Sequence, residues 1–323
     1  MPVTDLLKLH NLQIAFAQAG ASPIEPVRGI TLSLAAGAVL ALVGESGSGK
    51  TLTALSIMRL LPPPGFISSG EIFFEGQDLA ALSDNAIREI RGRRMSMVFQ
   101  EPMTSLNPVL RIADQVCEPM ILHEKLSRSN ALEKCETLLM EVGIPSPGER
   151  MRNYPHQLSG GMRQRVMIAM ALACHPALLI ADEPTTALDV TIQAQILELL
   201  DGLRRSSGLA LLLITHDLGI VAERADHTAV MYAGQIVESA PTSVLLADPR
   251  HPYTMALLAS LPQNAEPGKP LPTLSGQLSS SAIASAGCCF AERCPLSDPL
   301  CHTTAQQLHD VAPSHSVRCW KAL

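Results

Sequence analysis

The sequence predicts an α/β fold built around a largely parallel β-sheet with helices on both of its faces. Short, continuously apolar runs alternate with segments in which apolar residues recur every three or four positions, as in amphipathic helices. Strands and helices alternate in this way when crossover helices join parallel strands and cover both faces of the sheet. A Gly-rich turn follows the first apolar run, and a cysteine-rich segment lies near the end of the 323-residue chain.

Each element follows from a local pattern. The apolar runs that predict buried strands occupy 38–44, 95–100, 177–182, 209–215 and 227–234. A long amphipathic pattern that ends at a glycine predicts a helix over 191–208, and 101–158 reads as helices broken by proline-containing turns. Residues 263–287 are rich in Pro, Gly and Ser and predict a linker. We therefore expect a main domain over 1–262, this linker, and a cysteine-rich extension over 288–323.

Composition limits the classes of protein to consider. Hydrophobic residues make up 47% of the chain but aromatic residues only 3%, which predicts a mostly aliphatic core. The formal net charge is −6, which argues against a nucleic-acid partner because such partners normally require a basic face. The N-terminus lacks the pattern of a signal peptide, and no run of 18 apolar residues occurs. We therefore expect neither export nor a membrane span, and reduced cytosolic thiols rather than a disulfide framework.

The Gly-rich turn has the spacing of a phosphate-binding loop. It fits G-x-x-x-x-G-K-[ST] and consists of Gly44, Glu45, Ser46, Gly47, Ser48, Gly49, Lys50 and Thr51. Its glycines let backbone N–H groups converge on an anion, and the predicted helix directs its positive N-terminal end at the phosphates. We expect Lys50 to reach the β- and γ-phosphates and Thr51 to ligate Mg²⁺. The alternative is a turn that only permits close packing of helix and strand.

Two acidic residues follow the predicted strand over 177–182. Asp182 and Glu183 stand at its carboxyl end, where ligands bind in open α/β sheets. We expect Asp182 to hold the Mg²⁺ shell and Glu183 to act as general base toward water. The alternative is a solvated acidic turn. Together with the phosphate loop, the pair predicts an NTPase.

A second anion site is predicted at "LSGGMRQR", where Ser159, Gly160 and Gly161 precede a predicted helix. A chain with one phosphate loop does not need a second site for its own nucleotide. We therefore expect composite sites in a dimer, in which each phosphate loop faces the partner's Ser-Gly-Gly. A simple capped helix entered through a Gly turn is compatible with the same residues.

Six motifs in order resemble those of the ATP-binding-cassette (ABC) ATPases, and they cover most of the chain. They are Gly44–Thr51, Gln100, Leu158–Gln164, Leu178–Glu183, the run Ala187, Leu188 and Asp189, and His216. In turn they look like Walker A, the Q-loop, the signature, Walker B with its catalytic glutamate, the D-loop and the switch histidine. The resemblance implies a RecA-like P-loop core, an antiparallel β-subdomain from the N-terminal third, and a helical subdomain at about 101–160.

The same resemblance implies roles for residues outside the phosphate loop. It gives His216 a γ-phosphate-sensing role, Gln100 a catalytic and metal-site role that is coupled to the helical subdomain, and Phe16 a stacking role on adenine. It adds three residues to the expected nucleotide contacts, namely Thr53, Gln164 and Asp189. From the residues alone, His216 is equally well a strand-end histidine and Phe16 a core side chain.

Three longer segments narrow the resemblance to the ATPase subunits of bacterial dipeptide and oligopeptide importers, a group that includes nickel and opine-metallophore systems. They are "FQEPMTSLNP" (99–108), "YPHQLSGGMRQRVMIAMAL" (154–172) and "HPYTMALLASLP" (251–262). The group implies ATP as substrate and a peripheral position on the cytoplasmic face of the inner membrane. It implies as partners a homologous second ATPase or a second copy, two permeases and an extracytoplasmic binding protein.

The alternative within the ABC class is a soluble ATPase that acts on nucleic acid or ribosomes. The chain has one cassette rather than two fused ones, no basic stripe and no long charged insertion, which disfavours that function. Dipeptides, oligopeptides, nickel and metallophores all remain open as the solute.

Five of the eight cysteines lie near the C-terminus: Cys288, Cys289, Cys294, Cys301 and Cys319. Short C-x₂-C pairs are absent, and the spacing alone leaves zinc, an iron–sulfur cluster and unliganded thiols open. The "GC-x-F-x-x-RCP" segment resembles the tail of the peptide-importer ATPases, some of which carry a [4Fe-4S] cluster. Carried over, that resemblance implies Cys288, Cys294, Cys301 and Cys319 as ligands, with Cys289 as a competitor and Zn²⁺ as the alternative metal.

Overall fold

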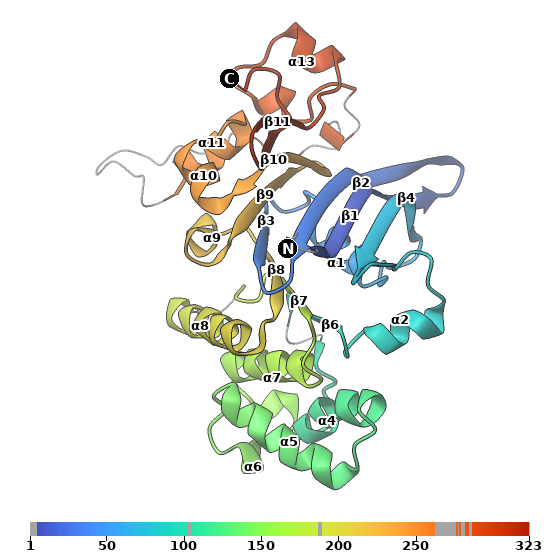
Figure 1. The fold of residues 1–323 in the computed structure, drawn as a ribbon, viewed down its shortest axis with the longest axis vertical. Coiled ribbons are helices and arrows are strands. Elements are labelled where there is room, and N and C mark those ends of the chain that lie inside the picture. Colours follow the sequence, from blue (N-terminus) through green and yellow to red (C-terminus); the bar gives the residue numbers. More distant parts are fainter. Residues whose placement is uncertain are drawn as a thin grey trace.

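The structure is a computed structural model that describes residues 5–101, 105–186, 189–261, 276, 278, 282–283 and 286–322. Two β-sheets lie at its centre, a group of helices at one end, and the cysteine-rich extension at the other (Figure 1). Almost all of the predicted linker lies outside the described residues, as do Ala187 and Leu188.

The larger sheet has eight strands in the order β11-β12-β10-β9-β3-β8-β7-β6. Their bounds are β3 (Val39–Val43), β6 (Met95–Val98), β7 (Leu178–Asp182), β8 (Ala210–Thr215), β9 (His227–Tyr232), β10 (Gln235–Pro241), β11 (His309–Ala312) and β12 (His315–Val317). The five predicted strands are confirmed, and all of them are parallel. Strands β10, β12 and β11 add an antiparallel edge beyond β9.

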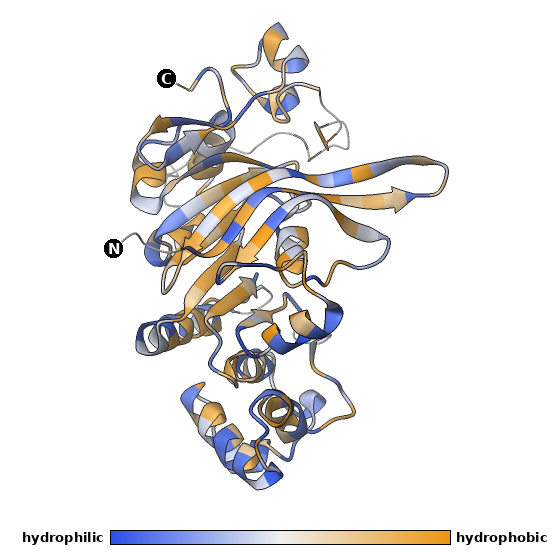
Figure 2. Ribbon diagram, turned by 45° about the vertical axis from the view of Figure 1, so that its right-hand side comes forward, coloured by the Kyte–Doolittle hydropathy of each residue, from blue (hydrophilic) through white to orange (hydrophobic). Residues whose placement is uncertain are grey.

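The central strands are apolar throughout because both of their faces are covered. Every residue of β3, β7 and β8 is buried. Figure 2 shows these strands as continuous hydrophobic arrows, unlike the mixed strands of the second sheet. A strand buried on both faces has no alternating pattern, which is why unbroken apolar runs predict it.

The second sheet is antiparallel, with the order β2-β1-β4-β5. It consists of β1 (Asp5–Gln18), β2 (Ala21–Ala35), β4 (Gly65–Phe74) and β5 (Gln77–Asp78). Its inward side chains, among them Leu9, Ile30 and Ile72, share one core with Leu40 and Leu42 of β3. The antiparallel subdomain is therefore joined to the parallel sheet through a common hydrophobic core.

Seven helices of the described chain lie around the sheets and the extension. Their bounds are α1 (Lys50–Ile57), α2 (Asp84–Ile90), α8 (Val190–Ser207), α9 (Leu218–Arg224), α10 (Thr242–Ala247), α11 (Pro252–Ala259) and α13 (Pro299–Thr303). Side chains cap several of them: Asp217 accepts hydrogen bonds from two N–H groups at the start of α9. Such caps satisfy backbone donors that the first turn leaves unpaired.

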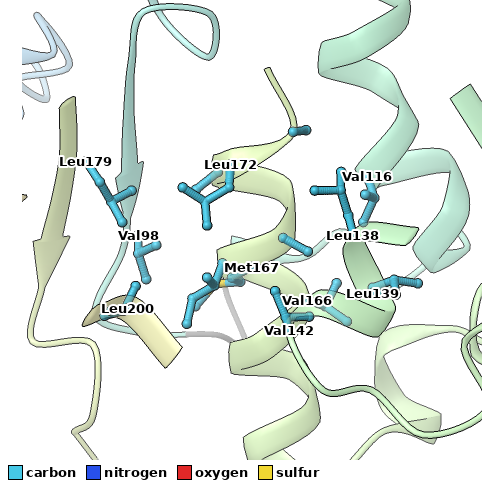
Figure 3. Packing of buried hydrophobic residues seen from close by; sticks show 14 of the residues in the cluster. Val98, Val116, Leu138, Leu139, Val142, Val166, Met167, Leu172, Leu179 and Leu200 are labelled. Atoms are coloured by element: carbon cyan, nitrogen blue, oxygen red, sulfur yellow. The ribbon is translucent and has the colours of Figure 1, made fainter. Parts of the chain in front are cut away.

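The predicted helical subdomain contains α4 (Ile112–His123), α5 (Arg128–Glu141), α6 (Pro147–Arg150), the 3₁₀ helix η1 (Pro155–Gln157) and α7 (Gly160–Leu172). Its core contains Val116 of α4, Leu138 of α5 and Val166 of α7 (Figure 3). The same cluster includes Val98 and Leu179 of the parallel sheet. One cluster therefore spans both parts, and α7 packs against both the other helices of the subdomain and the parallel sheet.

The extension adds strands to the main sheet. β12 pairs with β10, and β11 pairs with β12. The fully buried Glu238 of β10 accepts a hydrogen bond from Nε2 of His315 at 2.8 Å and from the backbone N–H groups of Arg250 and His251. The β12–β10 pairing and the His315–Glu238 hydrogen bond therefore hold 309–317 to the sheet, whereas the sequence predicted a separate appendix.

Candidate nucleotide site and cysteine pocket

The phosphate loop connects the end of β3 to the start of α1. Gly44, Gly47 and Gly49 have φ angles of 156°, 82° and 106°. A Cβ atom on Gly44 would lie 2.1 Å from the carbonyl oxygen of Met231, so no side chain fits there. Gly49 is the left-handed residue before α1. The loop therefore requires glycine both for its conformation and for its close approach to β9.

Lys50 is held inside this loop. Its side chain is buried, and Nζ donates to the carbonyl oxygens of Gly44 at 2.8 Å and Glu45 at 2.9 Å. Burial lowers the pKa of Lys50, while the negative charges of Glu183 and Asp182 oppose that effect. The ammonium group is thus fixed between the loop and the acidic end of β7.

Asp182 is the last residue of β7 and is buried. Burial raises its pKa, and a hydrogen bond with Thr51 opposes the shift. Its Oδ1 atom is buried and has no hydrogen-bond partner among the described residues. An unpaired buried carboxylate oxygen beside a threonine hydroxyl is an oxygen donor set that suits Mg²⁺.

Glu183 is the centre of a polar network. One oxygen, Oε2, accepts from Nε2 of Gln100 at 3.2 Å and from Oγ1 of Thr186 at 2.8 Å. The other, Oε1, lies 3.4 Å from Nδ1 of His216. Gln100, Glu183 and His216 follow strands β6, β7 and β8, so the parallel sheet brings them to one edge. Thr186 was not predicted; its only signal is its place three residues after Glu183.

The remaining predicted loop residues divide into two groups. Ser46, Gly47 and Thr51 are exposed, whereas Ser48 is buried and its carbonyl oxygen accepts from the N–H of Gly234. Thr53 is fully buried and donates its hydroxyl hydrogen bond to the carbonyl oxygen of Gly49. Because that hydroxyl is turned into its own helix, Thr53 is withdrawn from the expected nucleotide contacts.

Phe16 lies on β1 opposite Gly65 of β4. Its side chain is half-buried and packs partly against the core shared by the two sheets. A Cβ atom on Gly65 would lie 2.8 Å from the Phe16 ring, so glycine makes room for that ring. The geometry leaves one part of the ring accessible and the other in contact with the core.

The Ser-Gly-Gly segment opens α7. Ser159 caps this helix by accepting from the N–H of Met162 at 3.3 Å, and Ser159 and Gly160 are exposed. Gly161 packs against Ile192 of α8, the helix that Asp189 caps. Gln164 is buried instead. Within the described chain, no hydrogen bond joins Ser159 or Gly160 to the phosphate loop, so this exposed helix start is open to another molecule.

Four cysteines of the extension line one small pocket: Cys288, Cys294, Cys301 and Cys319. His251 and Trp320 complete part of its wall. A hydrogen bond from Cys289 lowers the pKa of Cys288 to about 4, against the effect of burial. Cys289 does not line the pocket; it is buried beside the carbonyl oxygen of Tyr232. In the described ranges, no group of three or more His, Cys, Asp or Glu side chains is arranged to hold a single metal ion.

Comparison with known proteins agrees with this geometry. Residues 27–186 match the family described as ABC transporter, and 237–301 match the oligopeptide/dipeptide transporter C-terminal region. A putative peptide import ATP-binding protein of Brucella melitensis is 49% identical over 97% of this chain and 96% of its own length. The chain belongs to the ATP-binding proteins of the oligopeptide/dipeptide ABC transporter family.

Other members of the family are similar over nearly the whole chain. The dipeptide transport ATP-binding protein DppD of Bacillus subtilis is 47% identical over 98% of this chain and 94% of its own length. The oligopeptide transport ATP-binding protein OppD of the same organism is 47% identical over 98% of this chain and 89% of its own. The chain is accordingly an ABC transporter ATPase, in which ATP hydrolysis powers translocation.

Solved ABC cassettes have the same fold. One, determined as a dimer in a post-hydrolysis state with ADP and Pi bound, aligns with a TM-score of 0.66 and 26% identity over 73% of this chain. The RecA-like core, the antiparallel subdomain and the helical subdomain that the resemblance implied are confirmed. Within the ranges that the structure describes, no helix has the length and apolarity needed to cross a membrane.

Proposed function

We propose that this ABC ATPase energises the import of di- or oligopeptides from the cytoplasmic face of the inner membrane. Its partners in this proposal are a homologous ATPase or a second copy, two permeases and an extracytoplasmic binding protein. The observation that carries the proposal is 47–49% identity to peptide-transport ATP-binding proteins over almost the whole chain. A separate match covers residues 237–301 and is to the oligopeptide/dipeptide transporter C-terminal region.

In the proposed mechanism, the phosphate loop binds the triphosphate through the N–H groups of residues 44–51, and Lys50 turns from the loop carbonyls to the phosphates. Thr51 and Asp182 would hold Mg²⁺, and Gln100 would act at the same metal site. Mg²⁺, when bound, neutralises phosphate charge during transfer. The unpaired Oδ1 of Asp182 supports this assignment because a buried carboxylate oxygen requires a partner.

Glu183 accepts a proton from the attacking water and His216 contacts the γ-phosphate. Their approach to within 3.4 Å, with Gln100 on the same carboxylate, supports roles in one reaction step. Ser159 and Gly160 bind the phosphates of the nucleotide held by the partner ATPase, which accounts for their exposure. Asp189 contributes to that interface from the start of α8, and Phe16 stacks on adenine.

The direct test is transport by the whole assembly. The chain, its partner ATPase and the permeases are purified together and placed in lipid vesicles with the binding protein. ATP-dependent accumulation of a labelled tripeptide is expected, together with ATP hydrolysis that rises when the loaded binding protein is added. Hydrolysis stimulated instead by RNA or ribosomes, with no association with permeases, would favour the soluble alternative and contradict the proposal.

We further propose that the cysteine pocket binds a [4Fe-4S] cluster through Cys288, Cys294, Cys301 and Cys319. The support is that the four thiols line one pocket, since four thiolates can ligate such a cluster, with tetrahedral zinc as the alternative. The low pKa of Cys288 supplies thiolate, the form that ligates metal. When bound, such a cluster supplies cross-links between the segments that carry its ligands.

Metal analysis of anaerobically purified protein tests this second proposal. We expect about four irons and four sulfides per chain, with broad visible absorption that bleaches on reduction. Cys301→Ala should lose the iron, whereas Cys174→Ala, which removes a buried cysteine of the main domain, should retain it. A content of about one zinc per chain would indicate a structural zinc site instead of a cluster. Four free thiols without metal would contradict both.

A further inference from the structure

The phosphate loop is tied to the C-terminal extension through the side chain of Glu45. Arg293, in the 3₁₀ helix η3 (Ala291–Arg293), binds this carboxylate through two atoms. Nη1 lies 2.7 Å from Oε2 and Nη2 lies 2.9 Å from Oε1. The Arg293 side chain is 9% exposed and that of Glu45 26%, so water screens the pair less than a surface ion pair.

Two tyrosines of the main domain hydrogen-bond to the members of this ion pair. The backbone N–H of Glu45 donates to the hydroxyl of Tyr253 at 2.9 Å. Nη1 of Arg293 donates to the hydroxyl of Tyr232 at 3.3 Å, and its guanidinium lies 5.8 Å from that ring's centroid. The Tyr232 and Tyr253 rings are themselves 4.7 Å apart. Both the backbone and the side chain of Glu45 are therefore held by residues that lie outside the phosphate loop.

The residues that hold Glu45 lie next to the lining of the cysteine pocket. Arg293 directly precedes Cys294, and Phe290 of the pocket wall packs on Tyr232 and Tyr253 at 5.2 and 5.3 Å between ring centroids. His251 caps α11 through the N–H of Tyr253 at 3.1 Å and also lines the pocket. A rearrangement of the pocket thus displaces the groups that hold Glu45.

The charge of Glu45 matters because it stands in a loop that receives a polyanion. A free carboxylate there repels the triphosphate, and its charge already acts on Lys50 of the same loop. We infer that Arg293 is a positioning residue for nucleotide binding: it cancels the charge of Glu45 and couples the cysteine-rich extension to the affinity for ATP. This inference rests on the proposed function of the loop as the ATP site.

The first test compares ATP dissociation constants of full-length variants, measured with a fluorescent ATP analogue. Arg293→Gln should bind roughly tenfold more weakly than the parent, within the range of couplings between sites. Arg293→Gln combined with Glu45→Gln should return to within about twofold of the parent because both charges are gone. Arg293→Lys should retain most of the affinity. Lys8→Gln removes one exposed positive charge from β1, outside the lining of the cysteine pocket, and should bind as the parent does.

Unchanged binding by Arg293→Gln would overturn the inference, and so would a double variant as weak as the single one, since that result indicates a merely structural role. A parent chain that binds no ATP would instead overturn the proposed function. These two failures are distinct because the parent is measured in the same series.

Reciprocity gives a second readout that does not depend on hydrolysis. In the parent, ATP should slow backbone hydrogen–deuterium exchange in residues 288–319, followed by mass spectrometry, by about the same factor that the coupling gives for binding. In Arg293→Gln, exchange should proceed at one rate with and without ATP. An ATP effect of equal size in this variant would show that the coupling bypasses Arg293, and the inference would fail.

Discussion

Replacing Glu183 with glutamine is expected to slow ATP hydrolysis by about a thousandfold, within the range for loss of a general base. The amide has nearly the same shape and keeps an oxygen to accept from Gln100 and Thr186, so the network survives while the basic oxygen is lost. ATP binding should stay within about twofold of the parent because the phosphate loop is unchanged. The variant should therefore accumulate as an ATP-bound dimer, visible by size-exclusion chromatography with ATP and Mg²⁺.

The matched control is Glu198→Gln, which removes an exposed carboxylate from α8 without touching the network. It should hydrolyse ATP at the parental rate. If the Glu183 variant hydrolyses ATP as fast as this control, the assignment of the general base is wrong. Asp182 and His216 are then the remaining candidates for that base.

Replacing Lys50 with methionine is expected to weaken ATP binding by about a thousandfold, the scale of losing one partner of a buried charge pair. Methionine preserves the apolar stem of the side chain, which is buried in the loop, but it removes the ammonium group that, in the proposed mechanism, binds the phosphates. Binding of ATP is measured by isothermal titration calorimetry, with thermal unfolding as a check on the fold. The folded variant should lose both binding and hydrolysis, in contrast to Glu183→Gln, which loses hydrolysis alone.

Lys8→Met supplies the control for Lys50, since it removes an exposed lysine from β1. ATP affinity should be the same as in the parent. A Lys50 variant that binds ATP with parental affinity would remove the phosphate loop from the proposed mechanism.

The parallel core and its acidic edge could be predicted because their patterns are local. A strand buried on both faces must be continuously apolar, and β3, β7 and β8 are short enough to be read from five or six such residues. Parallel strands also place their carboxyl ends together, which predicted a ligand site at Asp182 and Glu183, whereas the roles of Gln100 and His216 came only from the family resemblance. The structure brings the side chains of Gln100 and His216 to the carboxylate of Glu183.

Contacts made by the extension could not be predicted in the same way. β11 has four residues, all exposed, and β12 has three, two of which are buried. Patterns this short cannot be recognised in the sequence. Glu238 is a fully buried carboxylate whose partner His315 lies 77 positions away, and nothing local indicates that pairing. The Arg293–Glu45 contact spans 248 positions. It joins the phosphate loop to the cysteine-containing segment, and neither motif indicates a contact with the other. Long-range polar contacts depend on the packed fold rather than on sequence periodicity.

The pairing of β12 with β10 also bears on when the chain can finish folding during synthesis. Most of the main sheet is available once β10 has emerged from the ribosome, but Glu238 is then a carboxylate without its histidine at an open strand edge. Such an edge pairs readily with other chains. Residues 309–317 cover it, so the cassette is exposed to misassembly until these residues have emerged from the ribosome.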